Sequence, residues 1–195
     1  MSIDDLGDAL LAIARSAIGG SLGLPGGADA SHAGLSRPAA TFVTLKMHGE
    51  LRGCIGTLEP FRPLGLDVRE NALAAAFRDP RFLPLTTGEF EATTVEVSLL
   101  SESRALDIAG EDDLLARLRP GHDGLVLQYG HHRATFLPQV WDALADPRDF
   151  VAALKRKAGL PADFWSPQMV VSRYGVTKWA EAAAVAAEAG AELRR

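Results

Sequence analysis

Two pairs of β-rich segments, each joined by a very short turn, constrain this chain more than any other feature. The first turn is at residues 48–50 and the second at residues 130–132, and both contain glycine. Strands joined by so few residues form antiparallel hairpins. The expected hairpins are Thr41–Met47 with Leu51–Leu58 and Leu125–Tyr129 with Arg133–Leu137.

Helical patterns lie before, between and after these hairpins. Residues 3–18 carry apolar side chains at i, i+4, i+7 and i+11 from Leu6, which is one face of a helix. Pro63 fits the first turn of a helix that continues to about Phe77. Further expected elements are a strand at 92–101, helices at 112–118 and 146–157, and a last strand within 169–179. Because hairpins and helices mix without a regular βαβ repeat, we predict an α+β fold with a largely antiparallel sheet flanked by helices.

Length and composition are typical of a globular chain. Its 195 residues are 47% apolar and 23% charged, both near the globular average. A chain of this size buries about 70% of the surface that its extended form exposes, so a core can form without disulfides or metal. No apolar run approaches the roughly 18 residues that a membrane helix needs, so we expect no membrane association.

Charge and cysteine content exclude further classes. The net charge of −5 argues against non-specific binding to nucleic acid, which relies on Lys and Arg. The single cysteine allows neither an intrachain disulfide nor a CxxC pair. Acidic residues precede the apolar run Ala9–Ala14, whereas a secretory signal carries a basic leader, so we expect a cytoplasmic location.

The segment around the cysteine is the strongest candidate for chemistry. Residues i and i+2 of a strand share a face, so Arg52 and Cys54 would project together. A guanidinium beside a thiol favours the thiolate, which is the nucleophile. Gly53 and Gly56 would let a ligand or another backbone approach closely. The alternative is a buried cysteine that packs as a small apolar side chain at a bulge.

Two further residues are candidates to move protons. Glu96 alternates with Val95 and Val97, so it faces away from them and would serve as a general acid, a base or a cation partner. The alternative is a solvated position on the outer side of a sheet. Among the histidines we select His122 as a base for Cys54, because it lies in a glycine-flanked loop just before a strand.

Metal and cofactor signals are weak. Neither HExxH nor a spacing of two histidines and a carboxylate occurs, so we predict no metal and no cofactor. Three arginines follow the cysteine strand, at Arg69, Arg78 and Arg81. They would bind either an anionic ligand or carboxylates of the protein surface.

The hexapeptide Leu51-Arg52-Gly53-Cys54-Ile55-Gly56 resembles the signature of the AMMECR domain family, also called protein A of the AmmeMemoRadiSam system. Further blocks in family order are 42–45, 76–82, 95–100, 121–125 and 136–141. The resemblance predicts one AMMECR-like domain at residues 1–182. It contains a Gly/Ala-rich connector at 19–37 and is followed by an Ala/Glu-rich tail at 183–195.

The resemblance implies a fold and partners that spacing does not. The fold would have a larger lobe that holds both termini and a smaller lobe inserted in it, with Cys54 near the cleft between them. The partners would be a Memo-like protein and a radical-SAM protein. The resemblance supports Cys54 as a site residue without naming a reaction.

Three functions remain open. The first, which we favour, is an enzyme for a small molecule with Cys54 as nucleophile or acid/base thiol, Arg52 stabilising the thiolate, and Glu96 and His122 moving protons. The second is a non-catalytic binding or accessory module for the two partners. The third is a regulatory nucleic-acid binder, which the acidic charge and the lack of a known binding signature disfavour. The sequence does not specify an oligomeric state.

Overall fold

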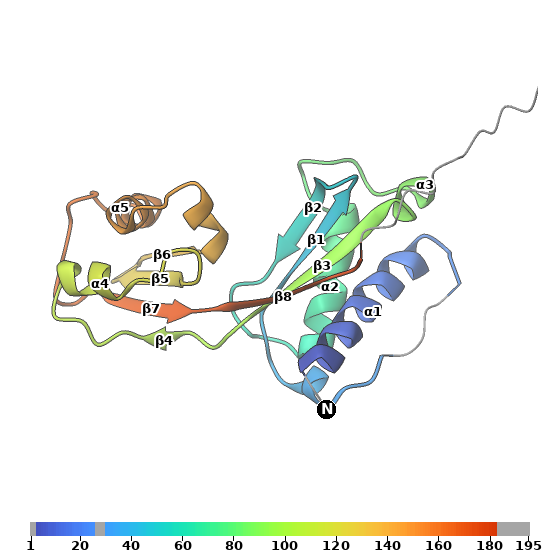
Figure 1. The fold of residues 1–195 in the computed structure, drawn as a ribbon, viewed down its shortest axis with the longest axis horizontal. Coiled ribbons are helices and arrows are strands. Elements are labelled where there is room, and N and C mark those ends of the chain that lie inside the picture. The colour runs from blue at the N-terminus through green and yellow to red at the C-terminus, as the bar shows by residue number, and fades with distance from the viewer. Residues whose placement is uncertain (1–2, 26–29, 183–195) are drawn as a thin grey trace, which may run out of the picture. The chain divides into compact units, whose positions relative to one another are not determined.

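The computed structural model describes residues 3–25 and 30–182, and they form two compact units (Figure 1). The first unit is built from the chain up to Ser98 and again from Lys178 onwards. The second unit is the inserted segment Leu99–Thr177. An insertion of one unit into another is the lobe arrangement that the family resemblance implies.

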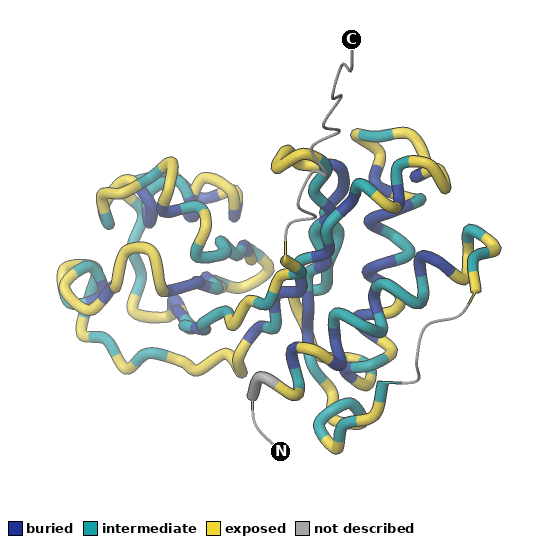
Figure 2. The backbone as a smooth tube through the Cα atoms, turned by 45° about the vertical axis from the view of Figure 1, so that its right-hand side comes forward, coloured by how far each residue is buried: buried dark blue, intermediate teal, exposed yellow. Residues whose placement is uncertain are grey.

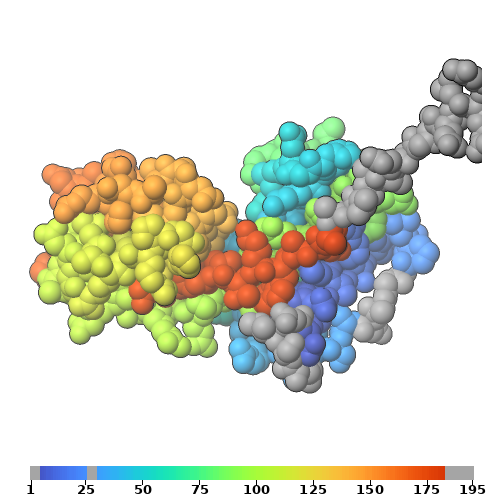
Figure 3. Space-filling model, in the orientation of Figure 1, coloured from blue at the N-terminus to red at the C-terminus, as the bar shows by residue number. Residues whose placement is uncertain are grey.

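The first unit contains one antiparallel hairpin within a four-stranded sheet of order β2-β1-β3-β8. Its elements are α1 (Ile3–Ser21), η1 (Ala33–Ser36), β1 (Thr41–Met47), β2 (Glu50–Gly56), α2 (Leu64–Phe77), α3 (Thr87–Phe90), β3 (Thr93–Leu100) and β8 (Val176–Ala180). The order makes β2 and β8 the two edges of the sheet. In the space-filling view the segment that contains β8, drawn in red, lies at the surface (Figure 3).

Helices α1 and α2 cover one face of this sheet (Figure 1). The strands turn Val43, Leu45, Val95 and Val97 toward the helices, and all four residues are buried. In Figure 2 buried stretches of the backbone, coloured dark blue, run along the strands and helices of this unit. At the β8 edge the indole of Trp179 lies so close to Gly7 of α1 that a Cβ there would be 2.2 Å from the ring. Alternate residues of each strand point to the opposite side. We call that side, turned away from α1 and α2, the outer face.

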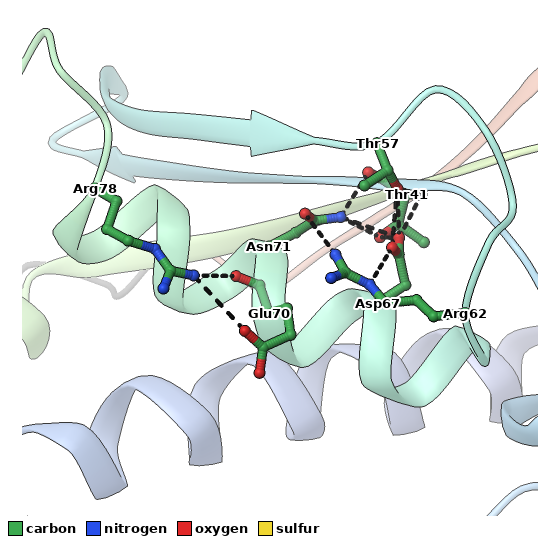
Figure 4. Close-up of polar contacts among 7 residues, drawn as sticks. All are labelled: Thr41, Thr57, Arg62, Asp67, Glu70, Asn71 and Arg78. Atoms are coloured by element: carbon green, nitrogen blue, oxygen red, sulfur yellow. Dashed lines mark hydrogen bonds and ion pairs between the residues drawn. The ribbon is translucent and has the colours of Figure 1, made fainter.

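A buried polar network fixes α2 to the ends of the hairpin (Figure 4). The carboxylate of Asp67, which is fully buried, accepts hydrogen bonds from the backbone N–H and hydroxyl of Thr41 at 2.8 and 2.6 Å. It also accepts from the Thr57 hydroxyl, the Arg62 guanidinium and the Asn71 amide. A buried carboxylate with so many partners is stable only in this arrangement, so the network sets where α2 lies on the sheet.

The second unit has its own antiparallel sheet, of order β4-β7-β5-β6, and its own core. Its elements are β4 (Arg104–Ala105), α4 (Glu111–Arg117), β5 (Gly124–Tyr129), β6 (His132–Phe136), η2 (Pro138–Asp142), α5 (Pro147–Lys157) and β7 (Val170–Tyr174). Fully buried side chains of β5 and α5 meet in the core, where Phe150 stacks on Trp141 with ring centroids 3.8 Å apart. Lys155 is also fully buried and donates to Glu111 and to the Ala162 carbonyl.

The predicted α+β class, with largely antiparallel pairing and flanking helices, is confirmed, and the strands are divided between two sheets rather than one. Two details differ. The segment 169–179 forms two strands, β7 and β8, which are separated by Gly175 and belong to different sheets. Helix α3 and the short strand β4 follow no pattern that we identified. The predicted tail at 183–195 lies outside the described residues, as does part of the 19–37 connector.

Candidate functional site

An extra residue in β2 interrupts the regular pairing of the hairpin. Lys46 of β1 pairs with Leu51, whereas the preceding residue of β1, Leu45, pairs with Gly53. Arg52 therefore lies between two paired residues and has no partner of its own in β1. One additional residue on one strand is the defining feature of a β-bulge, and bulges redirect the side chains that follow them.

The bulge turns Cys54 to the outer face. If β2 had no extra residue, regular pairing from the turn onwards would place Cys54 opposite Val43, whose side chain is buried beneath the helices. With the bulge, Cys54 pairs with Thr44 instead. Since a slip of one residue moves a side chain to the other face of a sheet, Cys54 leaves the core side and lies partly exposed on the outer face.

The contacts of Cys54 fix both its side chain and its peptide groups. The Thr44 hydroxyl donates a hydrogen bond to Sγ at 3.2 Å. The N–H of Cys54 donates to Asp79 Oδ2 at 2.8 Å, and its carbonyl accepts from Arg81 Nη2 at 3.2 Å. Because β2 is an edge strand, these two residues take the place of a neighbouring strand at Cys54.

Asp79 and Arg81 form a strong ion pair of their own. Arg81 donates to Asp79 from Nε at 2.9 Å and from Nη2 at 2.6 Å. The Arg81 guanidinium, with the backbone N–H groups of Cys54 and Arg81, holds the pKa of the Asp79 carboxyl well below its usual range, although burial opposes this. The same pairing raises the pKa of Arg81. Asp79 therefore stays ionised, and the half-exposed Arg81 stays cationic, next to the cysteine backbone.

Arg52 does not face the thiol as we expected. Its guanidinium donates to both carboxylate oxygens of Glu89 and to the Leu83 carbonyl, and it lies over the Phe82 ring. Arg52 is the extra residue of the bulge, so the regular i, i+2 spacing does not determine its direction relative to Cys54. Arg52 is 8% exposed, and its Nη1 is buried without a hydrogen-bond partner among the described residues. These contacts give Arg52 a structural role, between β2 and α3.

Glu96 lies on the outer face and binds two lysines. Its carboxylate oxygens are each 3.1 Å from an ammonium group, Oε2 from Lys46 of β1 and Oε1 from Lys178 of β8. Lys46 lies two residues from Thr44 on the same strand, so both side chains project to the outer face beside Cys54. Of the roles predicted for Glu96, the contacts match that of a cation partner.

His122 and the two signature glycines are placed differently. His122 belongs to the second unit, where its side chain is exposed and Nδ1 is 3.0 Å from the Pro120 carbonyl. A Cβ on Gly53 would lie 2.2 Å from the Ala75 carbonyl of α2, and one on Gly56 would lie 2.3 Å from the Phe42 ring. Close packing within the first unit thus accounts for both glycines, of which Gly53 admits the backbone of a helix.

Thr44, Lys46, Asp79, Arg81 and Lys178 are the site residues that sequence reasoning did not assign. Arg81 was considered only as a member of a cationic group. A signal for Thr44 existed in the alternation of β1, but the bulge had to be known before it could be paired with Cys54. Among the described residues, no three His, Cys, Asp or Glu side chains gather as metal ligands would. No helix in the described part of the chain is long and apolar enough to cross a bilayer.

The first unit is an α+β unit whose chain is interrupted by a second unit with its own sheet. The edge strand β2 of the first unit carries the cysteine. The model of the AMMECR1 family matches residues 11–179, and the chain belongs to this family.

Relatives and a solved structure agree with this assignment. Protein MJ0810 of Methanocaldococcus jannaschii is 41% identical over 60% of the chain, which spans 58% of that protein. A protein of Methanothermobacter thermautotrophicus is also 41% identical, over 68% of the chain and 70% of its own length. The crystal structure of the uncharacterized protein PH0010 from Pyrococcus horikoshii superimposes with a TM-score of 0.73 at 30% identity, covering 90% of this chain and 91% of that one.

Proposed function

We propose that this AMMECR1-family chain is a cysteine-dependent enzyme that acts on a small molecule at the outer face of the first unit. The observation that carries the proposal is the environment of Cys54. Its thiol lies on a partly exposed sheet face and accepts a hydrogen bond from Thr44, while Asp79 and Arg81 hold its N–H and carbonyl. A reactive group needs such fixed geometry to meet a bound substrate repeatedly in one orientation.

In this proposal the thiol acts as nucleophile or as acid/base group. A hydroxyl that donates to sulfur favours the thiolate, because hydrogen bonds to the charged form stabilise it. Arg81 replaces Arg52 as the cation of the site, since its guanidinium reaches the Cys54 carbonyl. By family resemblance the chain acts with a Memo-like protein and a radical-SAM protein.

The rate of Cys54 alkylation in the native protein tests this proposal. Because the chain has one cysteine, iodoacetamide labelling followed by intact mass needs no mutant background. We expect the native thiol, which is partly exposed, to react at least as fast as N-acetylcysteine amide at the same pH. The matched variant Thr44→Val keeps the shape of the side chain and removes the hydroxyl that donates to Sγ, so its thiol should react more slowly. Labelling that occurs only after denaturation would contradict a catalytic thiol.

A specific observation favours the second function, an accessory module for protein partners. Large apolar side chains are exposed at Leu51, Leu58, Phe61 and Leu83, the last being 82% exposed. They belong to edge strand β2 and to segments that follow it, and exposed apolar groups beside an edge strand are typical of binding surfaces. Co-purification with the Memo-like and radical-SAM proteins should then be lost in L51S/L83S and retained in Thr44→Val.

A further inference from the structure

The outer face beside Cys54 holds a fixed pair of ammonium groups. Lys46 comes from β1 and Lys178 from β8, and both bind the same carboxylate, that of Glu96. The chain has only four lysines, so half of them converge on one side chain. A single lysine would neutralise Glu96, and the second leaves the group with one net positive charge.

The two ammonium groups are available to a ligand. The side chain of Glu96 is 13% exposed, whereas those of Lys46 and Lys178 are 41% and 49% exposed. Each ammonium has three donors, so hydrogen bonding to Glu96 leaves further donors on both lysines. Because β1 and β8 both pair with β3, the sheet holds the two lysines on either side of Glu96 before any ligand arrives.

The thiol and the lysines share one surface. Thr44, which donates to the Cys54 sulfur, and Lys46 are alternate residues of β1, so their Cα atoms are about 7 Å apart. The neighbouring Asp79 and Arg81 form an ion pair and add no net charge. Of these charged groups, only the cluster of Lys46, Lys178 and Glu96 carries a net charge, and that charge is positive.

We propose that the site takes a substrate with an anionic group, a carboxylate or a phosphate, which Lys46 and Lys178 bind while a neighbouring carbon faces Cys54. This inference rests on the proposed function and names the substrate class for it. Glu96 holds the two lysines in place on the outer face through its two ion pairs. A neutral substrate would leave the excess positive charge unmatched.

A pair of alkylating agents tests the inference with the full chain. In both reactions the thiolate sulfur forms a bond to the methylene carbon and iodide leaves with the bonding electrons. Iodoacetamide is neutral and measures the reactivity of the thiol, whereas iodoacetate is anionic and also senses the lysines. We expect the ratio of iodoacetate to iodoacetamide rates to exceed that of N-acetylcysteine amide about threefold at low ionic strength. Added salt should reduce the excess.

In variants of Lys46, Glu96 and Lys178, the ratio of iodoacetate to iodoacetamide rates should increase with the net positive charge of these three positions. The net charge of the three positions is +2 in Glu96→Gln and +1 in wild type. It is zero in the triple variant K46Q/E96Q/K178Q and −1 in the double variant K46Q/K178Q. The rate ratio should fall in that order, by about two- to threefold per step. Arg69→Gln, at an exposed residue of helix α2 on the opposite side of the sheet, removes one positive charge elsewhere in the first unit and should leave the ratio unchanged. In the double variant K46Q/K178Q, Glu96 loses both of its cation partners. The triple variant removes the charge of Glu96 as well, so its result does not depend on whether the protein tolerates an unpaired Glu96.

The outcomes separate the two proposals. If iodoacetamide labels the native protein but the rate ratio is the same in all the charge variants, the proposal of an anionic substrate is overturned, whereas the proposal of a catalytic thiol is retained. If native Cys54 reacts with neither agent, the proposal of a catalytic thiol is overturned. Calorimetric titration with malonate then tests whether Lys46 and Lys178 bind an anion. We expect malonate to bind wild type and not K46Q/K178Q. Equal heats for both proteins would overturn the inference.

Discussion

Glu89 holds the guanidinium of Arg52 through two hydrogen bonds, at 3.0 and 3.1 Å. Hydrogen bonds from Arg52 and from the Thr86 backbone lower the pKa of Glu89 from 4.5 to about 2, against the opposing effect of burial. The same carboxylate completes a capping box with Thr86 at the start of α3. One side chain thus ties the signature strand to the segment that follows α2.

Glu89→Gln should reveal this pairing in the pH dependence of stability. Because the folded-state pKa is depressed, the ionised carboxylate stabilises the protein above pH 4.5, and this contribution is lost as the pH falls towards about 2. We expect E89Q to lower the free energy of unfolding by about 1–2 kcal/mol at neutral pH. Its stability should also fall less steeply than that of wild type between pH 4.5 and 2.

Urea denaturation at several pH values measures both effects. Glu91→Gln, at the exposed residue two positions further on, makes the same chemical change without the Arg52 contact and serves as the control. Parallel pH profiles for E89Q and wild type would mean that Arg52 does not hold Glu89 in solution.

Close contact between β2 and α2 is a property of whole elements. The backbone carbonyl of Ala75 leaves no room for a Cβ at Gly53. Gly53→Ala must therefore push α2 away from β2, and we expect it to lower the free energy of unfolding by about 1–3 kcal/mol, as overpacking does. Thermal or urea unfolding measures the loss.

Gly88→Ala is the matched control for this substitution. Gly88 lies in helix α3, and a Cβ there meets no atom within 4 Å. Alanine in a helix is favoured over glycine by up to about 1 kcal/mol, so this variant should be neutral or slightly more stable. A loss as large as that of G53A would show that the packing against Ala75 is not the cause.

The elements themselves could largely be predicted from the sequence. Alternating and helical periodicities placed the β1–β2 and β5–β6 hairpins, α2, β3 and α5 within a few residues, because each buries one regular face. A bulge near the cysteine was only one of two interpretations of the sequence, and its position at Arg52 could not be predicted, because it depends on how Gly53 packs against Ala75 of the following helix. The failure to pair Thr44 with Cys54 follows from it.

At the scale of the whole molecule, two separate cores replace the single sheet of the sequence-based expectation. The described residues divide into two units, each with a four-stranded sheet. The division was not visible in the sequence because β3 leads directly into the inserted segment and Gly175 alone separates β7 from β8. The family resemblance supplied it, whereas periodicity did not.

Separate cores predict that damage to one core is local. Phe150 is fully buried in the second unit, and Phe150→Ala should lower the stability of that unit by about 3–5 kcal/mol. We expect faster amide hydrogen exchange in β5 and β7, with protection of the β1–β2 hairpin unchanged. Val170→Ala, at a half-exposed position of the same unit, should alter neither. Equal loss of protection in both units after F150A would mean that they unfold together.

The central claim is that one extra residue in β2 pairs Cys54 with Thr44 and so turns the thiol outward. The N–H and carbonyl of Cys54 bind Asp79 and Arg81, so this pair exchanges no backbone hydrogen bonds, and such pairs bring their Cα atoms closest, to about 4.5 Å. A nuclear Overhauser spectrum of the labelled protein tests this directly. We predict a strong cross-peak between the α-protons of Thr44 and Cys54. Its absence, with Cys54 showing the contacts of a residue paired with Val43, would contradict the bulge and the site built on it.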